Sequence, residues 1–203
     1  MSVLHFSFIY MNHFCLVFEC MGPSIFYQIK AKIYKGFPLS YVQSMLKCVL
    51  PVLSDLSDLG LMHCDVKPEN ILTTFDNEQN IPLTKSKSYS QDLSYYSSPF
   101  LSQTAKSYDE ITPSLFERPE FKLIDFGSCM FSATNTIFEL QTIFYRAPEV
   151  ILKIPFDAKV DIWSLGCVSS ELFLGLPILP AHSEFQLASL IERTLGKFPE
   201  SMI

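Results

Sequence analysis

Two short runs of apolar residues near the start of the chain predict a pair of β-strands. Residues 3–10 and 14–19 are almost continuously aliphatic or aromatic, which is typical of strands rather than of amphipathic helices. Asn12 and His13 stand between the two runs, and Asn favours a tight turn. We therefore expect a hairpin at the start of the fold.

Apolar residues recur at helical spacing over much of the remaining chain. Residues 25–35 form a first helical pattern. A longer pattern follows from Ser40, which we expect to cap the helix, and it is interrupted only by Pro51. Further helices are expected near 158–174 and 184–195.

The stretch from 73 to 120 differs in kind from the segments around it. Between residues 84 and 114 it has nine Ser and four Tyr and few aliphatic residues, which indicates a mobile inserted loop. The apolar pattern returns with a short strand expected at Phe121–Ile124. Because strands come first and mostly helices follow, the sequence predicts a single α+β domain over residues 1–203.

The composition fits a globular domain with a substantial core. Of the 203 residues 48% are hydrophobic, with 18 Phe and 9 Tyr, which excludes a disordered chain. The formal net charge of −6 argues against a nucleic-acid-binding protein that neutralises phosphates. The six Cys residues lie far apart without a Cys-x-x-Cys pair, which favours reduced thiols in an intracellular protein of the cytoplasm or nucleus. The sequence leaves the oligomeric state open.

Two apolar segments raise the alternative of a signal peptide or a membrane span. The first of them, at the N-terminus, lacks a cationic start, because Lys30 is the first Lys or Arg of the chain. The second, Ile162–Pro180, carries Glu171 near its centre and Pro177 near its end. We expect no membrane span, and we expect the second segment to form a helix at the centre of the domain.

Three short motifs occur in one order along the chain. They are His-Cys-Asp-Val-Lys-Pro-Glu-Asn at 63–70, Asp-Phe-Gly at 125–127 and Ala-Pro-Glu at 147–149. Each motif alone is a weak signal, since short peptides of this kind arise by chance. Together and in this order they match the motif set of protein kinases.

The residues of these motifs have the chemistry that phosphoryl transfer needs. Asp65 can accept the proton of an incoming hydroxyl group, and Lys67 can reach the transferred phosphate. Asn70 and Asp125 can supply oxygen ligands to Mg²⁺ from two separate loops. Taken singly, each of these residue types is more often a solvated or helix-capping side chain. The occurrence of all four together favours a role in phosphoryl transfer over that alternative. His63 has apolar neighbours, so we expect it to pack in the core rather than to act in catalysis.

These motifs make the chain similar to eukaryotic protein kinases, and more narrowly to the CMGC group. The segments 63–72, 123–128, 144–152 and 161–167 resemble the dual-specificity tyrosine-regulated (DYRK and Yak-type) and homeodomain-interacting kinases. Cys64, at the position where most kinases have Arg, is typical of the DYRK type.

The resemblance implies a protein-kinase-like α+β fold. Residues 1–21 match the last strands of the small lobe and the hinge, and residues 22–203 match a helical large lobe with the insert at about 73–120. The sequence contains no Gly-x-Gly-x-x-Gly segment and no Val-Ala-Ile-Lys strand. It therefore resembles a kinase domain that is incomplete at both ends, and we expect these 203 residues to bind Mg-ATP weakly.

The resemblance also implies roles for single residues. Asp65 matches the catalytic base, Lys67 the catalytic-loop lysine, and Asn70 and Asp125 the Mg²⁺ ligands. The positions expected to contact ATP are Phe18 as the gatekeeper, Glu19 and Met21 in the hinge, Leu72 under the adenine ring, and Asp125. The structural or regulatory positions are His63, Phe126, Gly127, Glu139, Arg146, Glu149 and Asp161.

Two of these positions depart from the pattern of the relatives. In relatives, the glutamate that matches Glu149 pairs with an arginine from a segment that these 203 residues do not contain. We therefore expect Glu149 to be a buried carboxylate without a partner. Glu139 stands where DYRK-type relatives have a regulatory tyrosine, and Ile143 stands where they have an arginine. We expect Glu139 to pair weakly with Arg146 as a constitutive substitute for a phosphotyrosine.

The sequence thus predicts a protein serine/threonine kinase that uses ATP and Mg²⁺ and acts on protein substrates, with tyrosine as a further acceptor left open. The loop around Tyr145 and Arg146 often favours proline after the target residue in relatives. The alternative is a catalytically inactive pseudokinase or scaffold. Descent from an active enzyme is favoured because a pure scaffold has no need for all four of Asp65, Lys67, Asn70 and Asp125.

Overall fold

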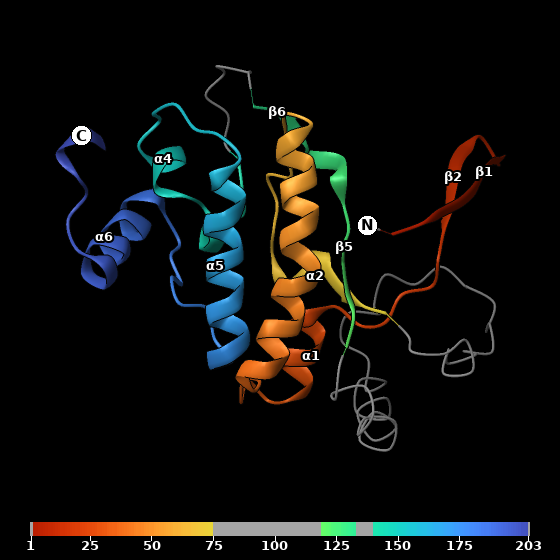
Figure 1. Ribbon diagram of the computed structural model, residues 1–203, viewed down its shortest axis with the longest axis horizontal. Coiled ribbons are helices and arrows are strands. Elements are labelled where there is room, and N and C mark those ends of the chain that lie inside the picture. Colours follow the sequence, from red (N-terminus) through yellow and green to blue (C-terminus); the bar gives the residue numbers. More distant parts are fainter. Residues whose placement is uncertain (1, 75–118, 133–139, 203) are drawn as a thin grey trace.

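The computed structural model describes residues 2–74, 119–132 and 140–202 (Figure 1). The segment predicted to be a mobile insert therefore lies almost wholly outside the described residues. The described residues at its two ends are Thr73, Thr74, Pro119 and Glu120. Thr73 belongs to a strand, and the N–H of Thr74 donates a hydrogen bond of 3.0 Å to the carbonyl of Glu120.

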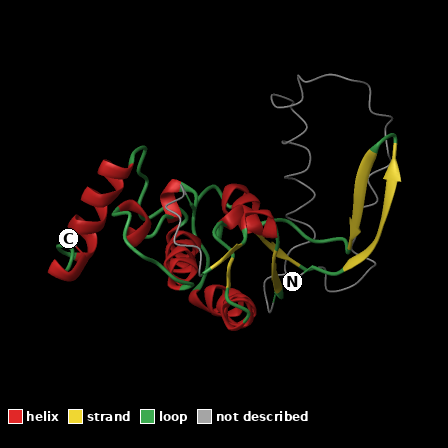
Figure 2. Cartoon of the chain, turned by 90° about the horizontal axis from the view of Figure 1, so that it is seen from above, coloured by secondary structure: helices red, strands yellow, loops and turns green. Residues whose placement is uncertain are grey.

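The predicted hairpin is confirmed. β1 (Leu4–Tyr10) pairs antiparallel with β2 (His13–Phe18). Met11 and Asn12 form the turn with positive φ values of 46° and 62°, as the favoured two-residue hairpin loops require. The hairpin projects from the rest of the molecule in two perpendicular views (Figures 1 and 2), and all side chains of β1 are exposed.

The first helix is shorter than predicted. α1 (Ile25–Ala31) is capped by the hydroxyl of Ser24, which accepts a backbone hydrogen bond of 3.3 Å. The helix was expected to reach Lys35, but Ile33 and Tyr34 adopt positive φ values of 53° and 58°. Such left-handed residues cannot continue a helix, so the chain turns there toward α2.

The second helix is longer and starts earlier than predicted. α2 (Leu39–Asp58) has Pro38 as its N-cap, and Ser40, the predicted cap, lies in its first turn. Pro51 does not interrupt the helix. The buried positions of α2 form one stripe and are Tyr41, Val42, Met45, Val49, Leu53 and Leu56.

Two short antiparallel ladders follow α2. β3 (Leu61–Met62) pairs with β6 (Met130–Phe131), and β4 (Ile71–Thr73) pairs with β5 (Phe121–Leu123). The first motif lies between β3 and β4, and the Asp-Phe-Gly motif lies between β5 and β6. The two ladders therefore bring both motifs to the same place.

Further helices complete the described part of the chain. α5 (Lys159–Leu174) and α6 (Glu184–Leu195) have the predicted bounds to within one residue. The shorter elements are η1 (Pro68–Asn70), η4 (Phe126–Ser128), η5 (Ile143–Tyr145), α4 (Pro148–Ile151) and η6 (Glu200–Met202). The predicted α+β class is confirmed.

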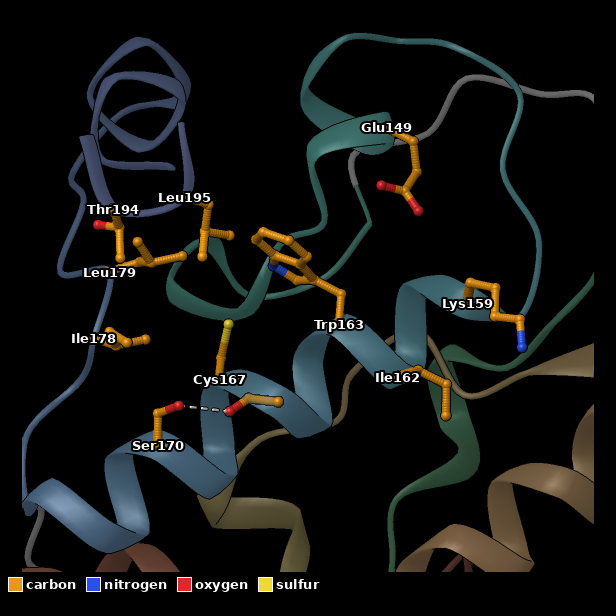
Figure 3. A pocket seen from close by; sticks show the side chains of 11 residues that line it. Glu149, Lys159, Ile162, Trp163, Cys167, Ser170, Ile178, Leu179, Thr194 and Leu195 are labelled. Atoms are coloured by element: carbon orange, nitrogen blue, oxygen red, sulfur yellow. Dashed lines mark hydrogen bonds between the residues drawn. The ribbon is translucent and has the colours of Figure 1, made fainter. Parts of the chain in front are cut away.

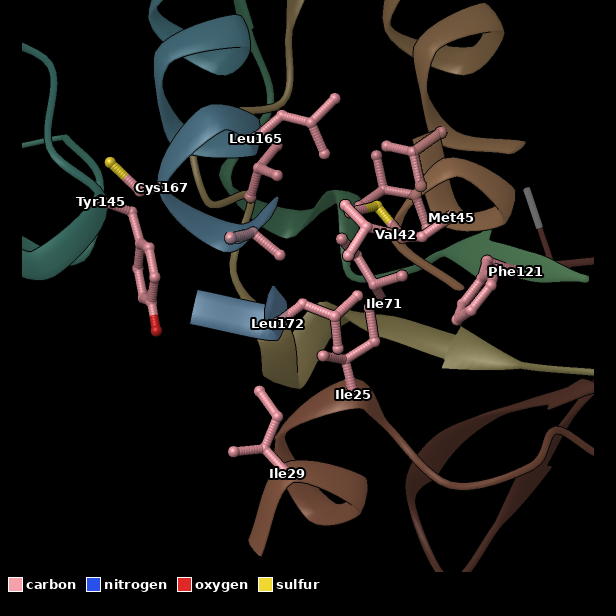
Figure 4. Packing of buried hydrophobic residues seen from close by; sticks show 14 of the residues in the cluster. Ile25, Ile29, Val42, Met45, Ile71, Phe121, Tyr145, Leu165, Cys167 and Leu172 are labelled. Carbon is pink, nitrogen blue, oxygen red and sulfur yellow. The ribbon is translucent and has the colours of Figure 1, made fainter. Parts of the chain in front are cut away.

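The main core lies where α2 and α5 run side by side (Figure 1) and where α1 and the β4–β5 ladder close its other end (Figure 4). Met45, Ile71 and Leu165 are fully or almost fully buried there. α5 is buried on several sides, as expected for the central helix of a domain.

In the part of the chain that the structure describes, no helix combines the length and the apolar content that crossing a bilayer requires. The segment considered above as a membrane span, Ile162–Pro180, begins within α5, a helix of 16 residues. Glu171 in this helix is buried and accepts a hydrogen bond from the hydroxyl of Tyr145.

Candidate active site

The loop between β3 and β4 is fixed by a carboxylate from α5. Asp161, 2% exposed, accepts hydrogen bonds from the backbone N–H of His63 at 2.6 Å and of Cys64 at 2.9 Å. Cys64 has a φ of 65°, a strained conformation for a residue with a side chain, and these bonds hold it there. Burial raises the pKa of Asp161, and the two backbone bonds oppose this rise.

His63 connects this loop to the Asp-Phe-Gly loop. Its ring is fully buried, with Nε2 lying 3.1 Å from the carbonyl oxygen of Ile124 and Nδ1 accepting the N–H of Asp65 at 3.3 Å. This pattern fits a neutral ring protonated on Nε2, and burial lowers the His63 pKa accordingly. The ring also meets Phe126 edge-on at 5.1 Å between centroids. His63 thus lies where the sequence analysis expected it, among packed residues.

Asp65 lies at the centre of a polar cluster. Its Oδ2 is 2.6 Å from Nζ of Lys67 and accepts from Nδ2 of Asn70 at 3.1 Å. Its Oδ1 accepts a hydrogen bond of 2.9 Å from Oγ1 of Thr142, which also lies 3.4 Å from Nζ of Lys67. The carboxylate is held from three sides yet stays partly accessible to solvent.

A cavity of about 250 Å³ opens onto this cluster. It is lined by Cys64, Asp65, Lys67, Ser128, Leu140, Gln141 and Thr142. Burial raises the pKa of the Cys64 thiol to about 12, so Cys64 is a packing residue of the cavity wall rather than a nucleophile. The cavity is large enough for a side chain that carries a hydroxyl group.

Asn70 and Asp125 bring amide and carboxylate oxygens to the two loops. The Nδ2 of Asn70 donates to the carbonyl of Asp65 at 2.9 Å, which fixes the amide and leaves Oδ1 free of hydrogen bonds to the described residues. Asp125 is exposed, has a φ of 64° and precedes η4, which contains Phe126 and Gly127. The loops are joined by the N–H of Ile124, which donates to the carbonyl of Asn70 at 2.9 Å.

Within residues 2–74, 119–132 and 140–202, no group of three or more His, Cys, Asp or Glu side chains converges on a metal site. A cation at Asn70 and Asp125 would therefore complete its coordination with oxygens from outside the protein. Mg²⁺ commonly binds in this way, through one or two carboxylates together with phosphate oxygens and water.

Arg146 is engaged on both sides of its guanidinium group. Its Nη1 lies 2.7 Å from Oε1 of Glu184, at the start of α6. Its Nε and Nη2 donate to the backbone carbonyl of Gln141 at 3.2 and 3.0 Å. Glu139, the partner that we expected for Arg146, lies outside the described residues. Arg146 already has a carboxylate partner in Glu184, which the sequence analysis missed.

Buried polar contacts anchor the segment before α4 to α5. The hydroxyl of Tyr145 donates to Oε2 of Glu171 at 2.7 Å, and Oγ of Ser164 donates to the carbonyl of Tyr145 at 2.6 Å. Burial raises the pKa of Glu171, and the hydrogen bond from Tyr145 opposes the rise. These contacts explain why an apolar central helix carries Glu171.

The predicted hinge is tied to β5 by an ion pair. Both carboxylate oxygens of Glu19 lie close to Nζ of Lys122, at 2.6 and 2.8 Å. Glu19 also accepts a hydrogen bond of 2.7 Å from the N–H of Val3. Both partners of the pair are 24% exposed, so solvent weakens the attraction. The bond to Lys122 lowers the pKa of Glu19.

The other positions expected on the adenine side lie on two neighbouring segments. Met21 is half-buried, and the next residue, Gly22, donates its N–H to the carbonyl of Thr73 at 2.7 Å. Leu72 is half-buried in β4 beside this contact. Phe18 ends β2 and is 46% exposed. The structure thus brings Met21 and Leu72 to adjacent backbones and leaves Phe18 at the base of the projecting hairpin.

The expectation for Glu149 is wrong in one respect. Glu149 is half-buried rather than buried, because it borders an open apolar groove of about 500 Å³ between α4, α5 and α6 (Figure 3). Among the described residues it has no ion pair. Trp163, on the same groove, has a buried Nε1 with no hydrogen-bond partner among the described residues. The carboxylate is therefore partly hydrated, which removes most of the expected penalty.

Comparison with known proteins shows similarity to protein kinases. The protein kinase domain model matches residues 112–200. The chain is 34% identical over 97% of its length to the dual specificity protein kinase YAK1 of Saccharomyces cerevisiae. It is 35% identical over 97% of its length to the serine/threonine-protein kinase AFC1 of Arabidopsis thaliana. It is 31% identical over 100% of its length to the human dual specificity tyrosine-phosphorylation-regulated kinase 4.

The chain is therefore similar to protein kinase domains. The kinases it resembles include DYRK- and Yak-like members of the CMGC group. It spans 20%, 39% and 32% of the lengths of the three relatives named above. The predicted family and the predicted partial kinase fold with a helical large lobe are confirmed.

The sequence analysis missed several residues that build the site. Thr142 and Gln141 line the cavity, Glu184 pairs with Arg146, and Lys122 pairs with Glu19. None of the four lies within a motif segment that carried the prediction. Their roles depend on contacts with residues distant in the sequence, for which the sequence offers no signal.

Proposed function

We propose that this chain is part of a protein serine/threonine kinase that transfers the γ-phosphate of ATP to a hydroxyl group of a protein substrate. The observation that carries the proposal is the placement of Asp65 on a cavity, with contacts to Lys67, Asn70 and Thr142. Phosphoryl transfer asks little covalent chemistry of the protein and depends on groups positioned in this way.

Asp65 accepts the proton of the substrate hydroxyl as this oxygen attacks the phosphate. Thr142 and Asn70 fix the orientation of the carboxylate, so that one conformation faces the cavity. Lys67 supplies positive charge beside the carboxylate and compensates the charge of the transferred group.

ATP and Mg²⁺ are the cofactors that this function requires. The Oδ1 of Asn70, which has no hydrogen bond to the described residues, and the exposed carboxylate of Asp125 are hard oxygen donors, which suits Mg²⁺. When bound, the ion neutralises charge on the phosphates of the nucleotide. Met21 and Leu72, on adjacent backbones, are the residues that we assign to the adenine side.

The substrate that fits best has proline directly after the target Ser or Thr. The carbonyl of Gln141 already accepts two hydrogen bonds from Arg146, so it cannot readily accept a third from a substrate backbone. Proline has no backbone N–H and leaves no donor unsatisfied at this point.

The proposed compartment is intracellular, in the cytoplasm or the nucleus. The six cysteines are free thiols, and their separation in sequence favours a reducing environment. A fractionation of cells that express a tagged chain checks this expectation.

The alternative function is an inactive binding module on the same fold. The 203 residues contain no Gly-x-Gly-x-x-Gly segment of the kind that covers the phosphates in active kinases. An active kinase needs the carboxylate of Asp65, whereas a binding module does not.

The test is transfer of labelled phosphate from Mg-ATP to a peptide that contains a Ser-Pro pair. We expect Asp65→Asn to lower turnover by about 100- to 10,000-fold, the range for loss of a general base. Asp55→Asn, on the exposed side of α2, is the matched control and should leave turnover unchanged. Equal transfer by the wild type and Asp65→Asn would contradict the proposed role, and no transfer by the wild type would favour the binding module.

A further inference from the structure

The turn after α1 has an isoleucine at a position where helices usually end on glycine. The N–H of Tyr34 donates to the carbonyl of Ile29 at 3.0 Å, and the N–H of Ile33 donates to that of Lys30, also at 3.0 Å. This pair of bonds is the Schellman ending of a helix, whose left-handed residue is normally glycine or asparagine. Here that residue is Ile33, with a φ of 53°, and Tyr34 follows with a φ of 58°. A β-branched side chain is strained in this conformation, which glycine adopts without steric cost.

Packing inside the molecule does not account for the choice of Ile33. Its side chain is 76% exposed, and the side chain of Tyr34 is exposed as well. The strain is therefore not offset by burial in the core. A residue that breaks a local rule without a structural gain points to a use for the exposed side chain itself.

The end of α5 adds apolar side chains to the same surface. The turn after α5 crosses the turn after α1 so closely that a Cβ at Gly175 would lie 2.1 Å from the carbonyl oxygen of Tyr34. Figure 1 shows the end of α5 beside the turn that joins α1 to α2. Leu174 and Leu176, on either side of Gly175, are both exposed. Four exposed apolar side chains thus gather where the two turns cross.

Positive charge accompanies these apolar side chains. Lys30 and Lys35 are exposed in the turn after α1 and have no ion pair among the described residues. The chain from 20 to 54 contains four Lys and no Asp or Glu, and the chain from 172 to 183 contains no Asp, Glu, Lys or Arg. The two segments that cross therefore form a locally positive region, although the whole chain has a formal net charge of −6.

We propose that this crossing surface is a docking site for an acidic segment of a partner protein that also carries large apolar side chains. The surface consists of Lys30, Ile33, Tyr34, Lys35, Leu174 and Leu176. The partner's apolar side chains cover Ile33 and its neighbours, and its carboxylates meet the two lysines. This inference goes beyond the proposed kinase function, because docking at this surface needs no phosphoryl transfer.

An acidic protein segment fits the crossing surface better than an anionic membrane or a second copy of the chain. Membrane-binding clusters contain roughly four to eight basic residues, more than the two exposed lysines here, and the net charge of −6 opposes approach to an anionic bilayer. A symmetric pair of copies would place the same lysines against each other. A short acidic segment meets only the local positive charge, because salt screens the more distant carboxylates.

The probe is a short fluorescent peptide, Glu-Asp-Leu-Glu-Glu-Phe-Leu-Asp-Glu, and its binding to the full chain is measured by fluorescence anisotropy. We expect saturable binding with a Kd below about 1 mM that weakens as salt is added. A peptide with Lys at every acidic position should not bind. A peptide with Ser at the Leu and Phe positions should bind at least about tenfold more weakly.

Ile33→Gly is the most informative variant. Glycine relieves the strain of the turn, so the midpoint of thermal unfolding should stay the same or rise by up to about 4 °C, while peptide affinity falls by about tenfold. Lys35→Glu should lower the affinity by a similar factor, because it places like charges together. Phe185→Ala and Lys47→Glu, on exposed sides of α6 and α2, are the matched controls and should bind like the wild type.

Several results would overturn the inference. One is wild-type binding weaker than about 1 mM. Another is an equal loss of affinity in the two control variants, and a third is a clear fall in the unfolding midpoint of Ile33→Gly, which would make Ile33 a packing residue. Vesicle binding to phosphatidylserine, or dimerisation in sedimentation, that Lys35→Glu abolishes and the acidic peptide does not compete with would assign the surface to a membrane or to a second copy instead.

Discussion

Apolar side chains are buried in the helical body around α2 and α5 but exposed in strand β1 of the β1–β2 hairpin. In the body, side chains such as Met45 and Leu165 are almost fully buried, and the polar groups of Asp161 and Tyr145 have partners. In the hairpin, Phe6 and the other residues of β1 are exposed, and a two-stranded sheet alone is at best marginally stable.

This difference divides the proposed site into two parts. The part that handles the hydroxyl group, around Asp65 and Thr142, rests entirely on the body. The part assigned to adenine is joined to the hairpin, which the Glu19–Lys122 pair ties to β5. We therefore expect the hydroxyl side to withstand changes that loosen the hairpin.

The ionisable groups of the two regions respond to pH with opposite signs. Burial raises the pKa values of Asp161 and Glu171 in the body. The bond to Lys122 lowers the pKa of Glu19 at the hairpin. A fall in pH therefore weakens the Glu19–Lys122 ion pair at the hairpin. In the body, protonation of Asp161 and Glu171 removes the free-energy cost of burying their charges.

The largest effect on stability is expected from Asp161→Ala. This change leaves two buried backbone N–H groups, of His63 and Cys64, without acceptors, at about 1–3 kcal/mol each. We expect the free energy of unfolding to fall by about 3 kcal/mol in urea titrations. Asp55→Ala, on the exposed side of α2, should change it by less than about 0.5 kcal/mol. Equal losses in the two variants would show that Asp161 does not brace the loop.

A pH-dependent effect is expected from Glu171→Gln. The folded pKa of Glu171 lies above its ordinary value of 4.5, so its contribution to stability is present below that value and lost as pH rises through the folded pKa. Gln cannot ionise and keeps an acceptor for Tyr145. The variant should therefore gain stability relative to the wild type between pH 4 and 8, as urea titrations at several pH values check.

Glu192→Gln, on the exposed face of α6, is the control for this comparison. Its stability relative to the wild type should be almost flat over the same range. A gap between Glu171→Gln and the wild type that narrows with rising pH would contradict the raised pKa.

The smallest effect is expected at the hairpin. Glu19→Gln removes a partly exposed ion pair with Lys122, worth at most about 1 kcal/mol. Its contribution is present above the ordinary Glu19 pKa of 4.5 and is lost as pH falls through the lowered folded value. Hydrogen exchange should accelerate in residues 4–18 and stay unchanged in residues 61–72. Faster exchange in both segments would mean that the hairpin and the body do not open independently. Lys47→Met, on the exposed side of α2, serves as the control.

The elements that the sequence predicted well are those with local signals. α6 begins after Ser183, whose hydroxyl accepts from the N–H of Gln186 at 3.2 Å, and its periodicity fixes its end. The hairpin also depends on short spacing along the chain, and so does the contact between Asp65 and Asn70 within one loop.

The sequence-based predictions were wrong where contacts between segments far apart in the sequence determine the structure. A side chain at Gly36 would bring its Cβ within 2.1 Å of the carbonyl oxygen of Phe173, and one at Gly175 within 2.1 Å of that of Tyr34. The turns at Gly36 and Gly175 cross so closely that α1 ends early. No local sequence pattern indicates this crossing. The partial exposure of Glu149 likewise depends on the groove between α4, α5 and α6.

Residues such as Thr142 and Gln141 were missed for the same reason. Thr142 is 77 residues from Asp65, and Gln141 is 23 residues from Ser164. Their side chains gain a role only after the body has folded, because neither spacing nor residue type sets them apart in the sequence.

The most direct test of the account compares Asp65→Asn with Asp125→Asn. Under the proposed function Asp65 acts on the hydroxyl group and Asp125 on the metal and nucleotide, so turnover and Mg-ATP affinity should separate the two substitutions. We measure phosphate transfer together with calorimetric Mg-ATP affinity, up to millimolar nucleotide because weak binding is expected. The account predicts that Asp65→Asn abolishes transfer with nearly wild-type nucleotide affinity and that Asp125→Asn weakens both. Equal effects of the two substitutions on Mg-ATP affinity would contradict it.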